Sequence, residues 1–179
     1  MRPPDSITDG VVVLRELREG DRAATLSAMR DAMVAQWLNM PAAPSDRDFD
    51  SLLRVARDGR ASGDRIDYAV TEAGQDVSLG AVIASRRHRD NYEIAYLARA
   101  EGRGRGLMTR AVRLLCDWLL EEGVGRIELR THPDNGASQK LAQRAGFTRE
   151  GLERKSIWLH SERQDAIVWS LLPTDPRRS

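Results

Sequence analysis

The feature that most constrains the fold is a glycine- and arginine-rich segment, Arg103–Thr109 (Arg-Gly-Arg-Gly-Leu-Met-Thr), between a strand-like run and an amphipathic helical pattern. Two glycines let the backbone turn tightly and approach a ligand without a Cβ in the way. The N–H groups in the first turn of the next helix have no intrahelical partner and attract anions. The segment therefore predicts a strand–loop–helix unit that binds a phosphate-bearing ligand. A glycine-rich turn that only caps a helix is the alternative interpretation.

Hydrophobic periodicity predicts the other elements. Strands are expected at residues 11–15, 66–70, 77–85, 92–98, 126–130, 153–159 and 166–172. Helices are expected at about residues 21–29, 33–38, 45–58, 107–122 and 135–145, with Asp21 as the N-cap of the first. The order β-α-α-α-β-β-β-α-β-α-β-β predicts an α/β (α+β) mixed sheet in a single domain covering residues 1–179. Its core should span about residues 11–172, with loose tails that include residues 1–10.

Composition excludes several classes of protein. The chain of 179 residues is 41% hydrophobic and 31% charged, which is typical of a globular domain, and its net charge of +1 is too balanced for a protein that coats nucleic acid. No apolar run approaches the roughly 20 residues of a membrane span. The N-terminal residues lack the apolar core of a signal peptide, so we expect a cytoplasmic protein without membrane contact.

The well-known phosphate motifs and metal sites do not match. The Walker P-loop spacing is absent, and the dinucleotide fingerprint fails because Leu107 stands where it needs a glycine. The three histidines and the lone Cys116 show no metal-site spacing, so no metal is expected. Cys116 lies among the apolar residues of the predicted helix, which favours a buried structural role. A covalent enzyme intermediate is therefore not expected.

Three polar residues lie close to the glycine segment in the predicted fold, one within the strand before it and two after the strand that follows it. Glu93 lies within the strand before it and can accept a proton near a bound ligand, or can simply face solvent. Asn135 and Ser138 begin the helix that follows the next strand. Asn135 can be an ordinary N-cap with Ser138 an incidental first-turn residue, or both can lie over a ligand at the strand ends.

Several motifs in order resemble the GNAT superfamily of N-acetyltransferases. Arg103, Gly106 and Met108 are similar to its Arg/Gln-x-x-Gly-x-Gly/Ala signature, with Met in place of the last small residue. The chain is most similar to the branch of the RimJ and RimL ribosomal-protein N-terminal acetyltransferases. The motifs that carry this resemblance are Glu93-Ile94-Ala95-Tyr96, Asn135-x-x-Ser138, Arg144-Ala145-Gly146-Phe147 and Glu150-Gly151.

The resemblance implies acetyl-CoA as the donor. Its pyrophosphate is expected on the backbone amides of Gly104, Arg105, Gly106, Leu107, Met108 and Thr109, and its pantetheine between splayed strands that end near Ala98 and Thr131. A backbone N–H near Leu97 or Ala98 would polarise the thioester oxygen. Glu93 would accept the proton of the attacking amine, with Glu150 or Glu153 as substitutes. Ser138 would stabilise or protonate the departing thiolate, and Asn135 would hold the cofactor.

The acceptor is left open by the sequence. The resemblance implies a protein N-terminus or a small-molecule amine, and apolar terminal strands would permit a homodimer. The alternative is a non-catalytic module that senses acyl-CoA or grips RNA through Arg86-Arg87-His88-Arg89 with Arg99, Arg103 and Arg105. The lack of interleaved aromatic residues argues against recognition of single-stranded nucleic acid.

Overall fold

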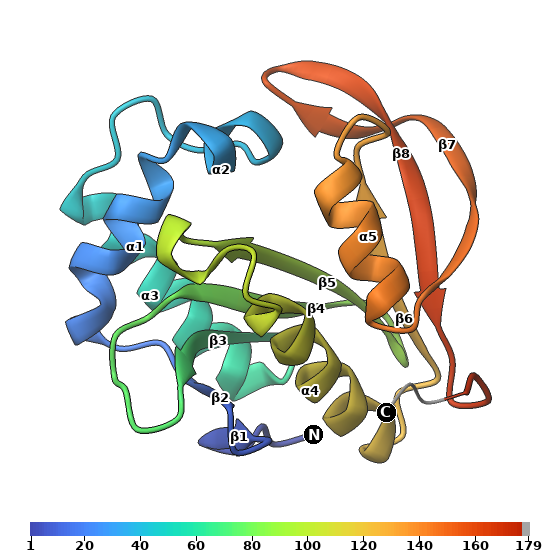
Figure 1. The fold of residues 1–179 in the computed structure, drawn as a ribbon, viewed down its shortest axis with the longest axis horizontal. Helices are drawn as coiled ribbons and strands as arrows, with labels where there is room; N and C mark the ends of the chain where they lie inside the picture. The colour runs from blue at the N-terminus through green and yellow to red at the C-terminus, as the bar shows by residue number, and fades with distance from the viewer. Residues whose placement is uncertain (177–179) are drawn as a thin grey trace.

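A single eight-stranded sheet organises the protein (Figure 1). The computed structural model describes residues 1–176. The strands are β1 (Ser6–Thr8), β2 (Val12–Glu16), β3 (Arg65–Glu72), β4 (Gly80–His88), β5 (Asn91–Ala98), β6 (Arg126–Thr131), β7 (Thr148–Leu159) and β8 (Glu162–Leu171). The helices are α1 (Arg22–Met29), α2 (Ala32–Trp37), α3 (Asp46–Ser62), α4 (Leu107–Glu121) and α5 (Gly136–Arg144). Two 3₁₀ turns, η1 (Glu19–Asp21) and η2 (Ala100–Gly102), complete the list.

The predicted mixed sheet is confirmed. Its strand order is β1-β2-β3-β4-β5-β6-β8-β7, and β5 and β6 form the parallel pair within an otherwise antiparallel arrangement. A parallel neighbour requires a crossover, and α4 supplies it between β5 and β6. The amphipathic helix predicted after the glycines therefore connects the two halves of the sheet.

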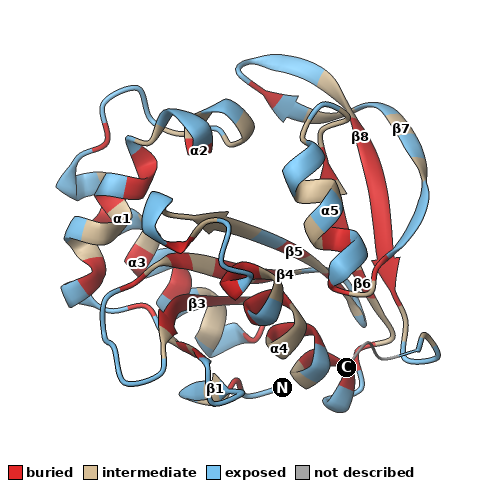
Figure 2. Ribbon diagram, viewed as in Figure 1, coloured by how far each residue is buried: buried red, intermediate tan, exposed pale blue. Residues whose placement is uncertain are grey.

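One face of the sheet is covered by α4 and α5 (Figure 2). The spacing of the apolar residues predicts a core face of six, of which Leu107, Ala111, Leu115 and Leu119 are buried, whereas Leu114 and Trp118 are half-buried. Met108, Val112, Cys116 and Leu120 are buried as well. The buried stripe of α4 is wider than its periodicity indicated, because the helix packs on the strands and also contacts α5. Cys116 is part of this core.

The other face is covered by α1 and α3, which enclose a smaller core built around Phe49, Leu26 and Leu53. Of the two glycines expected to end this helix, Gly59 and Gly63, the first lies inside α3. A Cβ at Gly59 would lie 2.5 Å from the Cβ of Arg65, so the missing side chain allows α3 to pass close to β3. The helix ends at Gly63, whose φ of 75° is left-handed.

One further expectation about the N-terminal region was wrong, and another holds only in part. Residues 1–10 are not merely a loose tail, because Ser6–Thr8 form β1 and pair with β2. Asp21 is the N-cap residue of α1 as expected, but its side chain forms no cap hydrogen bond with that helix. Its buried carboxylate accepts two hydrogen bonds from Arg15, at 2.7 and 2.8 Å, and one from the backbone N–H of Arg18 at 3.0 Å, in the capping box of η1. Among residues 1–176, no helix has the length and apolar character needed to cross a membrane.

Candidate active site

A cleft of about 730 Å³ opens where β5 and β6 separate. The two strands pair only from Asn91–Arg126 to Ile94–Leu129, and β5 then continues to Ala98 paired with β4 but not with β6. The cleft is lined by parts of α2, β5, the loop before α4, the end of β6, α5 and β7. In Figure 1 the arm with α1 and α2 stands apart from the arm with α5, β7 and β8. The predicted splay is thus a groove between the two arms.

The free part of β5 presents backbone hydrogen-bonding groups to this cleft. Arg99 N–H donates to the carbonyl of Leu79 at 2.9 Å, on the β4 side. Because backbone groups of an antiparallel strand alternate in direction, Leu97 also faces β4, whereas Ala98 faces the cleft. The carbonyl of Ala98 indeed accepts a hydrogen bond from Arg103 Nε at 3.0 Å on that side. Of the two candidate N–H groups, that of Ala98 points into the splay.

The glycine-rich loop forms one end of the cleft. Gly104 and Gly106 have φ values of 73° and 76°, which glycine adopts without strain, and a Cβ at either would meet nothing within 4 Å. Gly106 is the N-cap of α4, and no side chain caps the helix. The first-turn N–H groups therefore stay available for an anionic ligand. This open, uncapped helix start fits a pyrophosphate group.

The side chains of this segment have different surroundings. Arg103, Gly104, Gly106, Met108 and Thr109 line the cleft. The guanidinium of Arg103 lies 2.8 Å from the carboxylate of Asp31, so it connects the loop to the N-cap of α2. The guanidinium of Arg105 forms an ion pair with the carboxylate of Glu72 at 2.5 Å, and the side chain of Leu107 is buried in the core. Arg105 and Leu107 can therefore contact a ligand in the cleft only through their backbone.

Glu93 lies on the cleft wall within β5. Its Oε2 accepts hydrogen bonds from Arg87 Nε at 2.7 Å and from Arg130 at 2.9 Å. Both contacts are made by one carboxylate oxygen, which leaves Oε1 for a water or an amine.

The two alternative carboxylates do not line the cleft. Glu150 pairs with Arg126, where β5 and β6 are still paired, and hydrogen bonds from Arg126 and Ser170 lower its pKa to about 2. Glu153 pairs with Arg130 at 3.2 Å. Of the three acids, the structure brings Glu93 to the cleft.

Asn135 and Ser138 meet the cleft at the start of α5. Asn135 is the N-cap of α5, which was one of the two roles expected for it. Its Oδ1 accepts a hydrogen bond from Ser138 N–H at 3.0 Å. Ser138 Oγ accepts a hydrogen bond from the hydroxyl of Tyr96 at 2.7 Å. Burial raises the pKa of Tyr96, so its phenol stays protonated. This bond crosses from β5 to α5.

Several cleft residues were missed or left open by sequence reasoning. Trp37 and His132 line the cleft with their ring centroids 5.2 Å apart. Lys140 and Arg144 add cations from one side of α5, and their spacing of four residues on a predicted helix was a usable signal. Trp158 lines the cleft, whereas Trp169 is buried and donates to Thr131 at 3.0 Å. The sequence alone could not show which tryptophan lines the cleft and which lies in the core.

The tip of the β7–β8 hairpin closes the far end of the cleft. Asn39, which follows α2, donates to the carbonyl of Trp158 and accepts from His160 N–H, each at 2.8 Å. A ring nitrogen of His160 also lies 3.2 Å from the carbonyl of Gln36. These contacts join the two arms above the groove. In the described part of the chain, no group of histidine, cysteine and carboxylate residues could hold a metal ion.

Comparison with known proteins is consistent with this geometry. The family model described as "Acetyltransferase (GNAT) domain" matches residues 12–148. The "Probable N-acetyltransferase YjcK" of Bacillus subtilis is 35% identical over 112 residues. That match covers 60% of this chain and 62% of YjcK, so it spans less than two thirds of that relative.

Solved structures share the fold. Mycobacterium smegmatis RimJ in complex with a CoA disulfide has a TM-score of 0.83 at 22% identity, covering 94% of this chain and 88% of RimJ. RimL, described as a ribosomal L7/L12 alpha-N-protein acetyltransferase in complex with CoA, has a TM-score of 0.84 at 20% identity, covering 95% and 99%. The microcin C7 self-immunity acetyltransferase MccE, in complex with acetyl-CoA and AMP, has a TM-score of 0.84 at 20% identity, covering 96% and 98%.

Proposed function

Because this chain belongs to the GNAT acetyltransferase family, we propose that it moves an acetyl group from acetyl-CoA directly to a primary amine. The observation that carries the proposal is the cleft at the β5–β6 splay, which joins an uncapped helix start to Glu93 and Ser138. Acetyl-CoA supplies an activated acyl thioester. The residues of this chain bind it, orient it and move protons around it.

The loop at Gly104–Thr109 would hold the pyrophosphate through its backbone amides. Support comes from the absence of a side-chain cap on α4 and from the open space above Gly104 and Gly106. Lys140 and Arg144 add positive charge on the opposite wall. The unpaired edge of β5 would form hydrogen bonds with the pantetheine amides, as an exposed strand edge does with a peptide.

The reacting groups would meet beside β5. The N–H of Ala98 points into the splay and is placed to stabilise negative charge on the thioester oxygen. Glu93 lies on the same strand and would accept the proton of the amine, directly or through water. Its two arginine partners fix the position of the carboxylate and leave Oε1 for that task.

Ser138 would stabilise the departing thiolate with a hydrogen bond from its hydroxyl group. Its Oγ accepts a hydrogen bond from the hydroxyl group of Tyr96, and its backbone N–H donates a hydrogen bond to Asn135 Oδ1. Because the Tyr96 proton occupies one side of Oγ, the serine's own proton is directed elsewhere, and the cleft is the available direction. In this proposal Asn135 positions Ser138 through a cap, and Tyr96 sets the direction of its donor.

The acceptor is a primary amine of a protein N-terminus or a small molecule. Among the solved relatives, RimL is described as a ribosomal L7/L12 alpha-N-protein acetyltransferase and MccE as a microcin C7 self-immunity acetyltransferase. The acceptor would be framed by α2 and the β7–β8 hairpin, where Trp37 and Trp158 line the cleft.

Recognition of RNA is disfavoured by the arrangement of the arginines. Arg86, Arg87, Arg99, Arg103 and Arg105 each form an ion pair with a carboxylate, so the basic run is locally neutralised. A phosphate backbone binds where cationic charge is unopposed. An acyl-CoA sensor without catalysis is the remaining alternative.

The decisive experiment is thiol release from acetyl-CoA with a panel of peptide and small-molecule primary amines. We expect saturable thiol release with at least one amine, together with an acetylated product by mass spectrometry. Tight CoA binding in calorimetry with no release from any amine would favour the sensor. Absence of CoA binding would contradict both.

A further inference from the structure

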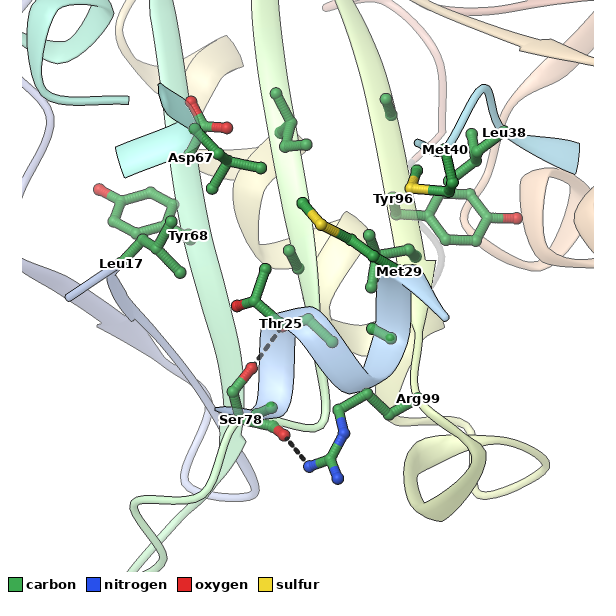
Figure 3. Close-up of a pocket in the computed structure, with 18 of the residues that line it drawn as sticks. Leu17, Thr25, Met29, Leu38, Met40, Asp67, Tyr68, Ser78, Tyr96 and Arg99 are labelled. Carbon is green, nitrogen blue, oxygen red and sulfur yellow. Dashed lines mark hydrogen bonds between the residues drawn. The ribbon is translucent and has the colours of Figure 1, made fainter. Parts of the chain in front are cut away.

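A second cavity of about 220 Å³ lies between α1 and the sheet, beside the cleft (Figure 3). Thr25 and Met29 of α1 lie across it from Asp67 and Tyr68 of β3, and Tyr96 of β5 marks its other side. It is separate from the loop that would hold the pyrophosphate.

The cavity exists because small side chains face each other across it. The strand register places Ala81 beside Leu97, and Ile83 beside Ala95, on the face covered by α1. Ala28 of α1 faces them and is buried. An apolar cavity of about 150 Å³ is large enough to take benzene. The second cavity can therefore hold a phenyl or branched alkyl group.

The charged groups at the wall are already paired. The buried carboxylate of Asp67 accepts two hydrogen bonds from Arg65, both at 2.8 Å. Arg99 donates to the carbonyl of Ser78 at 2.7 Å and pairs with Glu101 at 3.1 Å, while its buried Nε has no hydrogen-bond partner among the described residues. An incoming cation would lose its hydration without finding a free counter-charge. The cavity thus favours a neutral apolar group.

The cavity reaches the reaction site along one face of β5. Leu38, Ala95, Tyr96 and Leu97 line both the cleft and the second cavity. Side chains two residues apart on a strand share a face, so Ala95 lies between Glu93 and Leu97. Ala95 is exposed and carries only a methyl group, which leaves an opening between the proposed base and the end of the strand.

We propose that this second cavity binds a neutral apolar arm of the acceptor, attached close to the amine that is acetylated. This inference rests on the proposed function. An amine held between Glu93 and the N–H of Ala98 has its substituent beside Ala95, at the mouth of the cavity. The substrate class is therefore a primary amine with a phenyl-sized or isobutyl-sized neutral group, and amines with a second charged arm are disfavoured.

Two variants separate the cavity from general packing effects. Ala28→Phe fills the cavity from α1, outside the residues that line the cleft. Ala56→Phe enlarges an equally buried alanine on α3 that does not line the cavity. Because space is available only at Ala28, we expect its variant to keep the melting temperature while Ala56→Phe lowers it. A similar loss in both would show that the cavity is not open.

Direct binding tests the cavity without catalysis. Fluorobenzene, followed by fluorine NMR, should bind the wild-type protein and lose binding in Ala28→Phe but not in Ala56→Phe. Absence of fluorobenzene binding in the wild type would overturn the proposal. If fluorobenzene binds but no amine releases thiol from acetyl-CoA, the proposed function fails and the acceptor assignment fails with it.

Kinetics then identify the occupant. Among neutral amines, kcat/KM should rise about 10-fold or more from a methyl to a phenyl or isobutyl arm, and Ala28→Phe should abolish that preference. A cationic arm of the same length should give no gain. A parallel series of acyl-CoA donors from acetyl to hexanoyl should show no preference that depends on Ala28. A gain with longer acyl groups, lost in Ala28→Phe, would assign the cavity to the acyl chain and overturn the acceptor proposal.

Discussion

At the residue scale, the proposed chemistry depends on which single groups face the cleft. Glu93 lies on its wall, but one of its oxygens is held by two arginines. Arg130 also contacts Glu128 and Glu153, so the carboxylate belongs to a wider network of charges on the sheet. Such a network positions a base more rigidly than a lone carboxylate on a loop would be held.

Glu93→Gln should lower kcat by about 100-fold or more, because general-base catalysis contributes factors of that size. Acetyl-CoA affinity should stay near the wild-type value, since the carboxylate is assigned to the amine. Steady-state kinetics and calorimetry measure the two quantities. Glu153→Gln is the matched control, because it also loses a contact with Arg130 but does not line the cleft. Near-normal turnover in Glu93→Gln would remove Glu93 from the mechanism.

Tyr96→Phe should lower kcat by about 10-fold, the value of one hydrogen bond at the departing sulfur. The variant keeps the ring but removes the hydroxyl that bonds Ser138 at 2.7 Å. A purely structural role would not alter the thiol of bound CoA. We therefore expect its pKa, followed by ultraviolet absorbance of the thiolate, to rise in Tyr96→Phe and in Ser138→Ala alike. An unchanged thiol pKa would refute the positioning role.

At the scale of elements, the start of α4 and the edge of β5 form the donor side of the cleft. The helix start can receive an anion because Gly106, rather than a capping side chain, occupies the N-cap. The same element buries the centre of the main core, so the donor loop is rigidly tied to the sheet. The acceptor side instead depends on Asn39, which joins α2 to the β7–β8 hairpin.

Gly106→Trp should abolish acetyl-CoA binding while the protein stays folded. A side chain with positive φ costs about 1–2 kcal/mol, and the indole would occupy the space above the loop. Gly74→Trp is a matched control, since Gly74 has a φ of 77°, also has open space around it, and does not line the cleft. Calorimetry should show binding only in the control, while both melting temperatures fall by a similar amount. Unchanged acetyl-CoA binding in Gly106→Trp would contradict the proposal that this loop holds the pyrophosphate.

At the scale of the whole molecule, two arms are joined by the short parallel pairing of β5 with β6. The Arg126–Glu150 ion pair and the hydrogen bond from Ser170 to Glu150 at 2.7 Å tie β6, β7 and β8 together. The stability that these contacts contribute should depend on pH, because the pKa of Glu150 is lowered to about 2 from an ordinary 4.5.

The folded state should lose stability as the pH falls from about 4.5 towards 2. A carboxyl with a lowered folded-state pKa stabilises the fold above its unfolded pKa, and this contribution disappears as pH falls through the folded value. The effect of this one group is modest, because its side chain is 39% exposed. In thermal unfolding at several pH values, Glu150→Gln should show a shallower decline than the wild type. The exposed Glu121→Gln serves as the control, and identical slopes in all three would contradict the assignment.

Sequence reasoning succeeded where one segment contained its own signal. The glycines at 104 and 106, the apolar stripe of α4 and the Asn135 cap are local patterns, and each is present in the structure. It failed where a partner outside the segment decided. The Asp21 carboxylate pairs with Arg15 and forms no side-chain cap on α1, and residues 6–8 join the sheet through β2.

By itself, the sequence determined the order of elements from β2 onwards, the mixed sheet and the position of the glycine-rich loop, because backbone conformation and hydrophobic periodicity are short-range properties. Only the tertiary structure decided which carboxylate reaches the cleft, since Glu93, Glu150 and Glu153 look alike until strand register separates them. It also created the second cavity, because Ala28, Ala81 and Ala95 come from three elements that meet only in the folded chain. The glycine-rich loop proposed for the donor is thus a local feature of the sequence, whereas the cavity proposed for the acceptor depends on long-range packing.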